Sequence, residues 1–152
     1  MFKNIKKFFA LDAQRKKLFF TAYFLTGSVR FTLYRKPFKD LVTHLDLHRD
    51  AVQLAVLEPG LQATARSVGW AVRAAARYTP WKSTCLVQVL TAQRMLQKRG
   101  IAGGFYLGAS TEPDDEIAAE ISAHAWLKCG AEYITGEAGH EKFTVVSSFT
   151  WG

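Results

Sequence analysis

Two side chains in this sequence have the chemistry of a nucleophile and its base. Cys85 follows Ser83 and Thr84, either of which suits the N-cap of a helix that begins at the cysteine. His124 lies 39 residues later, in a stretch typical of a strand. Both a helix N-terminus and a nearby imidazole favour the thiolate, which is the reactive form of a cysteine. The two residues together therefore predict a thiol enzyme.

Each residue also has an ordinary structural interpretation. A cysteine on the apolar face of a helix is often a small buried side chain, and a single histidine on a strand is often structural. Alternation along the strand places His124 on the same face as Trp126 and on the opposite face from Ala125. The other cysteine, Cys129, stands at the end of this strand without a comparable setting, and we interpret it as a bystander.

A third residue is expected to orient the imidazole and to stabilise its charged form. If the chain turns back through two residues at 130–131, Glu137 falls opposite His124. A turn one residue earlier places Thr135 there instead, because register follows turn geometry. Glu137 is therefore the candidate for the third catalytic residue, with Thr135, or a dyad without a third residue, as alternatives. The ordinary structural interpretation of Glu137 is a solvent-exposed carboxylate in a loop.

No metal or cofactor is expected. His44 and His48 lie four residues apart in a weakly helical segment, with Asp40 one turn earlier. On a straight helix Asp40 and His48 would lie about 12 Å apart, too far to bind one ion, which favours a solvated polar face. CxxC and HExxH spacings are missing. Two cysteines do not make a disulfide framework and suit a reducing compartment, so a cytoplasmic location is expected.

The charge of the chain is concentrated in its first third. Residues 1–50 contain 11 Lys and Arg against 4 Asp and Glu, whereas residues 51–152 contain 9 of each. Such asymmetry indicates either an anionic partner or a solvated basic face. No zinc finger, helix-turn-helix or RNP-type motif accompanies it, so nucleic acid is not expected. The two longest uncharged runs have 12 residues each, too few to span a bilayer, and membrane contact is not expected.

The length of 152 residues and the apolar fraction of 49% predict one compact domain. Apolar periodicity and turn residues divide it into a basic helical part, residues 1–58, and a core, residues 59–152. Helices followed by an antiparallel sheet predict an α+β fold. The expected elements are helices at 11–35, 61–77 and 85–99, a weak helical pattern at 39–58, an acidic loop at 111–116, and strands at 103–108, 121–129, 132–135 and 143–149.

An ordered set of short segments resembles one family. It comprises residues 81–88 around Cys85, the helix that ends at Gly100, and the strand segment 105–108. It continues with the run 124–127 that begins at His124 and closes with residues 143–146. The set is similar to the transglutaminase-like leader peptidases of bacterial lasso-peptide biosynthesis, in the stand-alone form without a leader-recognition domain. The similarity covers residues 60–150 well and the N-terminal part more loosely.

The resemblance implies a papain-like or transglutaminase-like cysteine protease fold and a defined role. Such proteins remove the leader from a ribosomally made precursor, so that a separate ATP-dependent cyclase can close the ring. Cys85 would attack the scissile carbonyl and His124 would move the proton. The family usually has an aspartate after the histidine, near the positions held here by residues 135–137. Either Glu137 takes its place or the enzyme works as a dyad. The short chain also implies that a separate recognition protein binds the leader, with the basic N-terminal third or the apolar surface of residues 18–34 as part of its docking surface.

Two other functions fit the same residues. A thiol acyltransferase or transglutaminase-type crosslinker uses the same chemistry, with an amine in place of water as the final acceptor. A non-catalytic peptide-binding module of the same fold would need no reactive Cys85. Product analysis separates the first from a peptidase, and alkylation of the thiol separates the second.

Overall fold

In the computed structural model, which describes residues 2–49, 52–110 and 122–152, five strands form one antiparallel sheet in the spatial order β1-β5-β2-β3-β4. The first strand of the chain therefore pairs with the last. The strands are β1 (Asp46–His48), β2 (Gly103–Ser110), β3 (Ser122–Cys129), β4 (Glu132–Thr135) and β5 (Thr144–Trp151).

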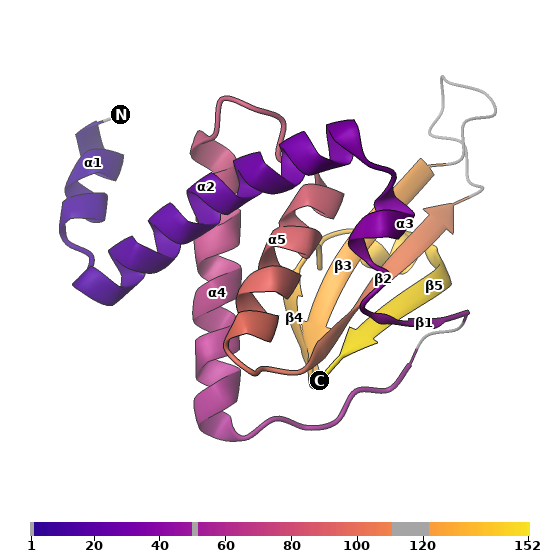
Figure 1. Ribbon diagram of the computed structural model, residues 1–152. Helices are drawn as coiled ribbons and strands as arrows, with labels where there is room; N and C mark the ends of the chain where they lie inside the picture. The colour runs from indigo at the N-terminus through magenta and orange to yellow at the C-terminus, as the bar shows by residue number, and fades with distance from the viewer. Residues whose placement is uncertain (1, 50–51, 111–121) are drawn as a thin grey trace.

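Three long helices lie on one side of this sheet: the second and third pack against its face, and the first packs across those two helices (Figure 1). They are α2 (Ala13–Arg35), α4 (Pro59–Tyr78) and α5 (Cys85–Lys98); shorter elements are α1 (Phe2–Phe9), α3 (Phe38–Leu41) and the 3-10 turn η1 (His140–Lys142). The predicted α+β class is thus confirmed, with helices first and most of the sheet second. Among the described residues, no helix combines the length and the apolar character needed to cross a bilayer.

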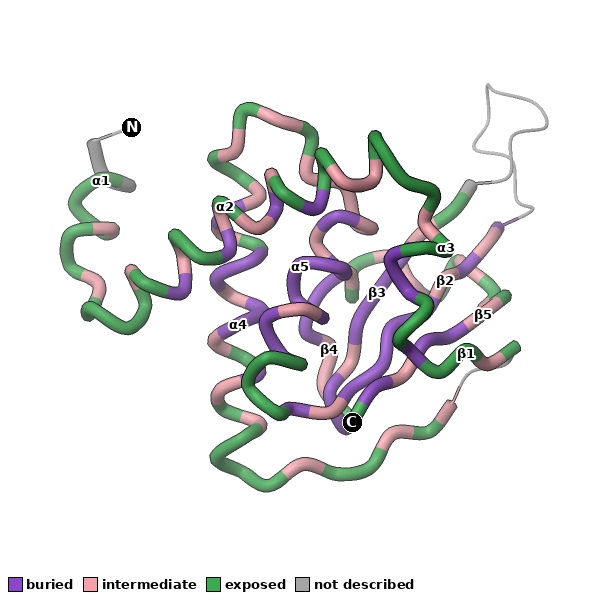
Figure 2. The backbone as a smooth tube through the Cα atoms, in the orientation of Figure 1, coloured by how far each residue is buried: buried purple, intermediate pink, exposed green. Residues whose placement is uncertain are grey.

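The core lies between the helices and the sheet, as the buried segments in Figure 2 show. On the helical side, Val72 and Leu96 are completely buried. On the sheet side, Phe105 stacks on Phe149 with ring centroids 4.9 Å apart, and Leu127 lies beside them on β3. Burial of side chains of this size contributes about 1.5–3 kcal/mol each. These contacts fix α5 against β3, the two elements that carry the candidate site.

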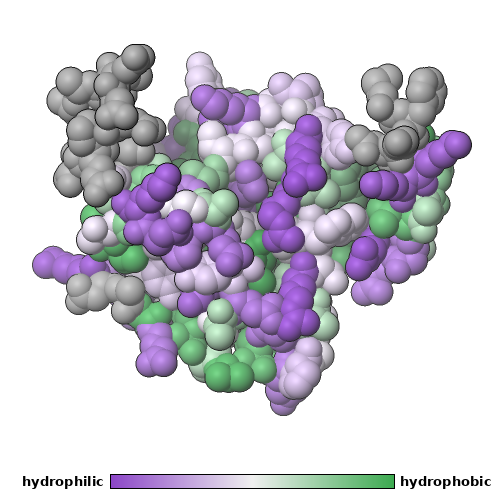
Figure 3. Space-filling view, turned by 180° about the vertical axis from the view of Figure 1, so that it is seen from behind, coloured by the Kyte–Doolittle hydropathy of each residue, from purple (hydrophilic) through white to green (hydrophobic). Residues whose placement is uncertain are grey.

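The opposite face of the sheet looks different. Viewed from behind, hydrophilic side chains are spread over the surface with smaller hydrophobic areas between them (Figure 3). Alternation explains the contrast, since successive side chains of a strand point to opposite faces. On β3, Ala125 and Leu127 belong to the core, whereas Trp126 lies on the other face and stacks on Tyr106.

The N-terminal part shares this core. Leu18, Ala22 and Val29 of α2 are buried in the same cluster as α4 and α5. The helix continues through Gly27, where an added Cβ would lie 2.9 Å from the ring of Trp81. A glycine at this position therefore allows an indole ring to lie against the backbone of α2.

The weak helical pattern at 39–58 is a wrong prediction for most of that segment. Among its described residues, 39–41 alone are helical, as the end of Phe38–Leu41, and Asp46–His48 forms β1 on the edge of the sheet. Leu41, Val42 and Leu45 are buried, whereas Leu47 in β1 is exposed. β1 gains its hydrogen bonds from β5. His44 and His48 consequently do not share a helix face. Their Nε2 atoms lie 3.2 Å from the Gln97 side chain and 3.0 Å from Thr150 Oγ1.

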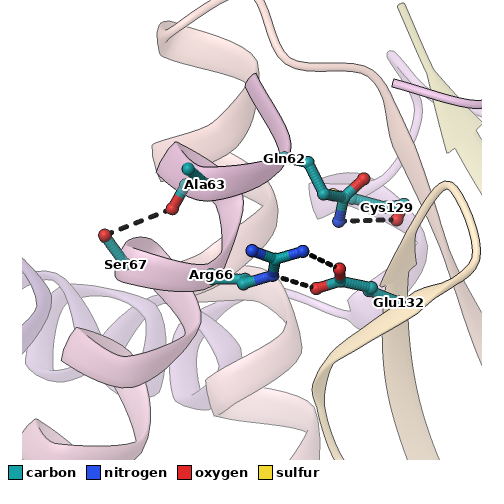
Figure 4. Close-up of polar contacts among 6 residues, drawn as sticks. All are labelled: Gln62, Ala63, Arg66, Ser67, Cys129 and Glu132. Carbon is teal, nitrogen blue, oxygen red and sulfur yellow. Dashed lines mark hydrogen bonds and ion pairs between the residues drawn. The ribbon is translucent and has the colours of Figure 1, made fainter. Parts of the chain in front are cut away.

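Helix α4 closes the other edge of the sheet. Arg66 forms two parallel hydrogen bonds with the carboxylate of Glu132 on β4, and the Gln62 amide donates to the Cys129 carbonyl at 3.2 Å (Figure 4). The Arg66 hydrogen bonds lower the pKa of Glu132. A further arginine, Arg73, donates a hydrogen bond to the backbone carbonyl of Ile134. Helix α4 thereby covers the outer edge of β4. These contacts also hold the end of the strand, and so the start of the segment after it, in place.

Candidate active site

Cys85 is the first residue of α5, at the place predicted for a nucleophile. Thr84 is the N-cap, with extended backbone angles and a hydroxyl that accepts a hydrogen bond from the Val87 N–H at 3.3 Å. Of the two predicted caps, Thr84 is therefore the one used. The first N–H groups of a helix have no partner within the helix, and they place partial positive charge around the partly exposed thiol.

The loop before Cys85 is fixed by side-chain hydrogen bonds. The Ser83 hydroxyl lies 2.8 Å from that of Thr79, and the Gln88 amide donates to the Ser83 carbonyl at 3.1 Å. The Trp81 indole donates to Thr26 Oγ1 of α2 at 3.2 Å. The backbone on the N-terminal side of the thiol is thus held from both α5 and α2. The run 81–88 carried the family resemblance, but the contact with α2 was not visible in the sequence.

His124 lies on β3 with its ring half-buried. Its Nε2 atom is 2.8 Å from the carbonyl oxygen of Gly136. A carbonyl only accepts hydrogen bonds, so Nε2 carries the proton and donates it. In the neutral ring, Nδ1 is then the atom with a free lone pair. The ring also lies between two aromatic side chains, Trp126 at 5.8 Å and Phe143 at 5.2 Å between centroids.

Gly136 is a site residue that sequence reasoning missed. It directly follows β4 with φ 75°, and an added Cβ would lie 2.4 Å from the carbonyl oxygen of Ala125. Glycine therefore allows the chain to turn close against β3 and aim its carbonyl at the imidazole. The next residues are fixed as well, since the backbone N–H and the ring Nδ1 of His140 both bond to the Glu137 carbonyl, the latter at 2.6 Å. In the sequence, this site residue was signalled by a glycine that directly follows a predicted strand.

The register of the hairpin is only partly the predicted one. Cys129 pairs with Glu132 across the two-residue turn, as expected. The ladder then becomes irregular between Leu127 and Lys128, so that Thr135 pairs with Leu127. The Thr135 hydroxyl is buried, and no hydrogen bond to it is found within the described ranges. Neither register prediction for the residue opposite His124 is therefore realised in the ladder, which ends at Thr135.

The side chain of Glu137 is exposed, and its charge acts on Arg73 of α4. Burial and the charge of Arg77 lower the pKa of Arg73, and the charge of Glu137 acts in the opposite direction. Among residues 122–152, the His124 ring donates a hydrogen bond to the Gly136 carbonyl, and it has none with the Glu137 carboxylate. A catalytic role for Glu137 remains a prediction.

Cys85 and His124 occupy the same end of the molecule. Helix α5 packs on β3, and both elements begin at the end that is uppermost in Figure 1. Within the described part of the chain, no hydrogen bond joins the thiol to the imidazole. Contacts of this kind are often long without substrate and shorten in the reacting complex. Cys85 packs against the core, whereas His124 stacks on Trp126 on the other face of β3. The pairing of the two residues remains a prediction.

The second cysteine has a different environment. Cys129 is fully buried, and burial, followed by the charge of Glu132, raises its pKa to about 12. Its thiol is held in the unreactive neutral form, which agrees with its interpretation as a bystander. Across the residues that the structure describes, no three His, Cys, Asp or Glu side chains lie together in a way that could hold a metal ion.

Comparison with known proteins adds one finding. The family model described as the transglutaminase-like superfamily matches residues 33–148, which include both Cys85 and His124. No curated protein and no solved structure gives a significant match. Proteins of this superfamily are typically cysteine proteases or transglutaminases, and both transfer an acyl group through a cysteine. A match over most of the chain, together with a capped cysteine helix beside a histidine strand, shows that the protein belongs to the transglutaminase-like superfamily.

Proposed function

We propose that this protein is a cysteine peptidase that removes the leader from a ribosomally synthesised lasso-peptide precursor. The observation that carries the catalytic part is the hydrogen bond from His124 Nε2 to the Gly136 carbonyl at 2.8 Å. It leaves Nδ1 as the ring nitrogen with a free lone pair, and the proposed mechanism uses this nitrogen as the base for Cys85. The superfamily membership supports acyl chemistry at this cysteine. The ordered sequence segments around both residues favour the leader peptidases within it.

The first half of the reaction forms a thioester. The Cys85 thiol transfers its proton to His124 Nδ1, and the sulfur attacks the scissile carbonyl carbon. N–H groups at the start of α5 are placed to stabilise the oxygen of the tetrahedral intermediate, where they act with the helix dipole. The intermediate collapses as the carbon–nitrogen bond breaks, and the imidazolium gives its proton to the leaving amine. The core peptide leaves with a free N-terminus.

Water completes the second half. His124 Nδ1 accepts a proton from the attacking water, and the thioester carbon–sulfur bond breaks to release the leader as a carboxylate. The proton returns to the sulfur, so that the enzyme ends as it began. The Gly136 carbonyl stabilises the imidazolium in both halves, because the hydrogen bond from Nε2 strengthens when the ring is charged. In this scheme a backbone oxygen has the orienting role that a side-chain carboxylate has in other triads.

The proposal includes three partners. The substrate is a precursor peptide with leader and core, and a separate recognition protein presents the leader. An ATP-dependent lasso cyclase consumes the freed core N-terminus. A reducing cytoplasm suits this setting because the free thiol of Cys85 has to remain unoxidised.

The test is a cleavage assay with mass spectrometry. A lasso precursor encoded beside the gene is incubated with the recognition protein encoded there and with the enzyme. We expect free leader and core from the wild-type protein, and a loss of roughly a thousandfold or more in rate with Cys85→Ala or His124→Ala. Cys129→Ala is the matched control and should cleave at the wild-type rate, because that thiol is buried away from the site.

Other products would overturn parts of the proposal. A leader whose mass shows an added amine in place of water would identify a crosslinker. Unimpaired cleavage by Cys85→Ala would exclude the thiol mechanism. A wild-type protein that binds the precursor without cleaving it, under conditions in which Cys85 is alkylated no faster than a free thiol, would identify a binding module.

A further inference from the structure

The helical layer of the protein has an unusual charge composition. Helices α2, α4 and α5 together contain ten Lys and Arg side chains, five, three and two respectively, and no Asp or Glu. Only one of these ten forms an ion pair among the described residues, namely Arg66 with Glu132. The three helices are therefore strongly positive and supply no carboxylate to neutralise this charge, which attracts anionic partners.

Part of this charge surrounds a groove between α2 and the C-terminal half of α5. The groove has a volume of about 740 Å³. Its lining includes three apolar side chains, Phe24, Leu25 and Met95. Phe24 is 68% exposed, although a ring of this size is usually buried. The groove thus offers an apolar surface that the rest of the described chain does not cover.

Four cationic side chains line the same groove, and no carboxylate does. They are Lys17 from α2, Arg94 and Lys98 from α5, and Arg99 just after it. None of the four takes part in an ion pair with another described residue, and Arg99 alone has a side-chain hydrogen bond, to the Met95 carbonyl. An occupant that matches this lining carries both negative charge and apolar side chains.

We propose that this groove binds an acidic, amphipathic segment of a partner polypeptide. On the α2 side the lining runs from Lys17 to Ser28, a rise of roughly 16 Å, which equals about three turns of a bound helix. The apolar side chains of the segment lie on Leu25 and Met95, and its carboxylates face the flanking cations. This inference goes beyond the proposed function, because neither Cys85 nor His124 takes part.

Shape and chemistry favour a polypeptide over the other anionic classes. A nucleic acid would pair phosphates with the cations but would make little use of the apolar lining. A lipid surface is entered by side chains that project from a helix, whereas in this groove Met95 is buried and Leu25 is partly buried. Side chains that project from a partner peptide reach both.

The test measures binding to the full-length protein with the Cys85→Ala change, so that cleavage plays no part. The probe is a fluorescein-labelled peptide of about 15 residues in which Glu and Leu follow helical spacing. The affected variant is Lys17→Glu with Lys98→Glu, both exposed. The matched control is Lys39→Glu with Lys142→Glu, which changes the net charge equally at exposed positions outside the groove. Phe24→Ser tests the apolar part, and circular dichroism checks that each variant folds.

We expect fluorescence anisotropy to show that the Lys17 and Lys98 reversal raises Kd about tenfold or more, and that the control raises it less than about threefold. Phe24→Ser should raise Kd about threefold or more. Equal weakening by the two double variants would overturn the proposal, because it would show a response to net charge alone. Tighter binding to labelled oligo-dT, or to vesicles of phosphatidylglycerol and phosphatidylcholine, would overturn it in favour of a nucleic acid or a lipid surface. Absence of peptide binding at low salt would also overturn it.

Discussion

The imidazole of His124 donates a hydrogen bond from Nε2 to the carbonyl oxygen of Gly136, 2.8 Å away. This single contact fixes which ring nitrogen holds the proton and which is available as a base. It also fixes the orientation of the ring without a carboxylate. The predictions about the site below follow from this contact and from the positions of the neighbouring residues.

The first prediction concerns the tautomer. When neutral, His124 should be in the form protonated at Nε2, because the carbonyl offers only an acceptor. Long-range proton–nitrogen correlation spectra of the histidine-labelled protein distinguish the two forms, and a His124→Gln sample assigns the signals. A ring protonated at Nδ1 in the neutral state would contradict the geometry and the proposed direction of proton transfer.

Gly136→Ala should both destabilise and inactivate the protein. The added Cβ would lie 2.4 Å from the Ala125 carbonyl oxygen, in a backbone conformation with positive φ. Strain and overlap together should lower the free energy of unfolding by about 2–4 kcal/mol. Urea unfolding gives the stability, and cleavage at low temperature, where the variant is folded, gives the activity. Gly139→Ala is the control, since it also has positive φ but meets no neighbour. Equal activity losses for the two variants would contradict a specific role for the Gly136 carbonyl.

Glu137→Gln should retain activity within about threefold of wild type, because an exposed carboxylate that does not contact the ring contributes little to its orientation. Steady-state cleavage kinetics measure this directly. A fall of a hundredfold or more in kcat with unchanged KM would show instead that Glu137 moves onto His124 in the reacting complex. That outcome would restore the carboxylate as the third catalytic residue.

The contrast between Cys85 and Glu137 shows what sequence can predict at this site. The helix at Cys85 follows from apolar residues at i, i+4, i+7 and i+11, a serine or threonine N-cap and a glycine after its end, all of which are local signals. The partner of His124 depends on an irregular ladder between Leu127 and Lys128, which shifts every residue beyond it. The group that bonds the ring is also a backbone carbonyl. Every residue has one, so side-chain types do not reveal it.

Edge strand β1 illustrates the same limit for the fold. Its three residues form a strand because β5, about one hundred positions away, supplies the hydrogen bonds. Apolar spacing in the segment 39–58 only indicated burial, and a weak helical period was one of several ways to achieve it. The long helices and the hairpin strands, by contrast, have strong local signals. The predicted ends of these elements lie within a few residues of the observed ends.

The buried thiol of Cys129 should make stability depend on alkaline pH. Its pKa is raised to about 12 in the folded protein, whereas the unfolded thiol titrates near 9.0. The folded state therefore retains the proton longer, and this contribution is complete below pH 9 and lost as the pH rises toward 12. Relative to Cys129→Ala, the wild-type free energy of unfolding should fall by about 1 kcal/mol per pH unit in this range. Urea titrations of both proteins at several pH values measure the difference. A constant difference would show that the thiol ionises in the folded state.

Gly27→Ala should reduce activity from a position on α2. The new Cβ would lie 2.9 Å from the ring of Trp81, which is held by its hydrogen bond to Thr26 and leads directly into the loop before Cys85. Displacing the indole should move that loop and lower kcat about tenfold, since small misplacements at a reacting centre are costly.

Gly60→Ala is the matched control, because it also adds a methyl group to a helix but meets no atom within 4 Å. The control should gain about 0.5–1 kcal/mol of stability from helix propensity and keep its activity. If both variants kept full activity, the contact between α2 and the loop would be structural only, and α2 would not position the nucleophile.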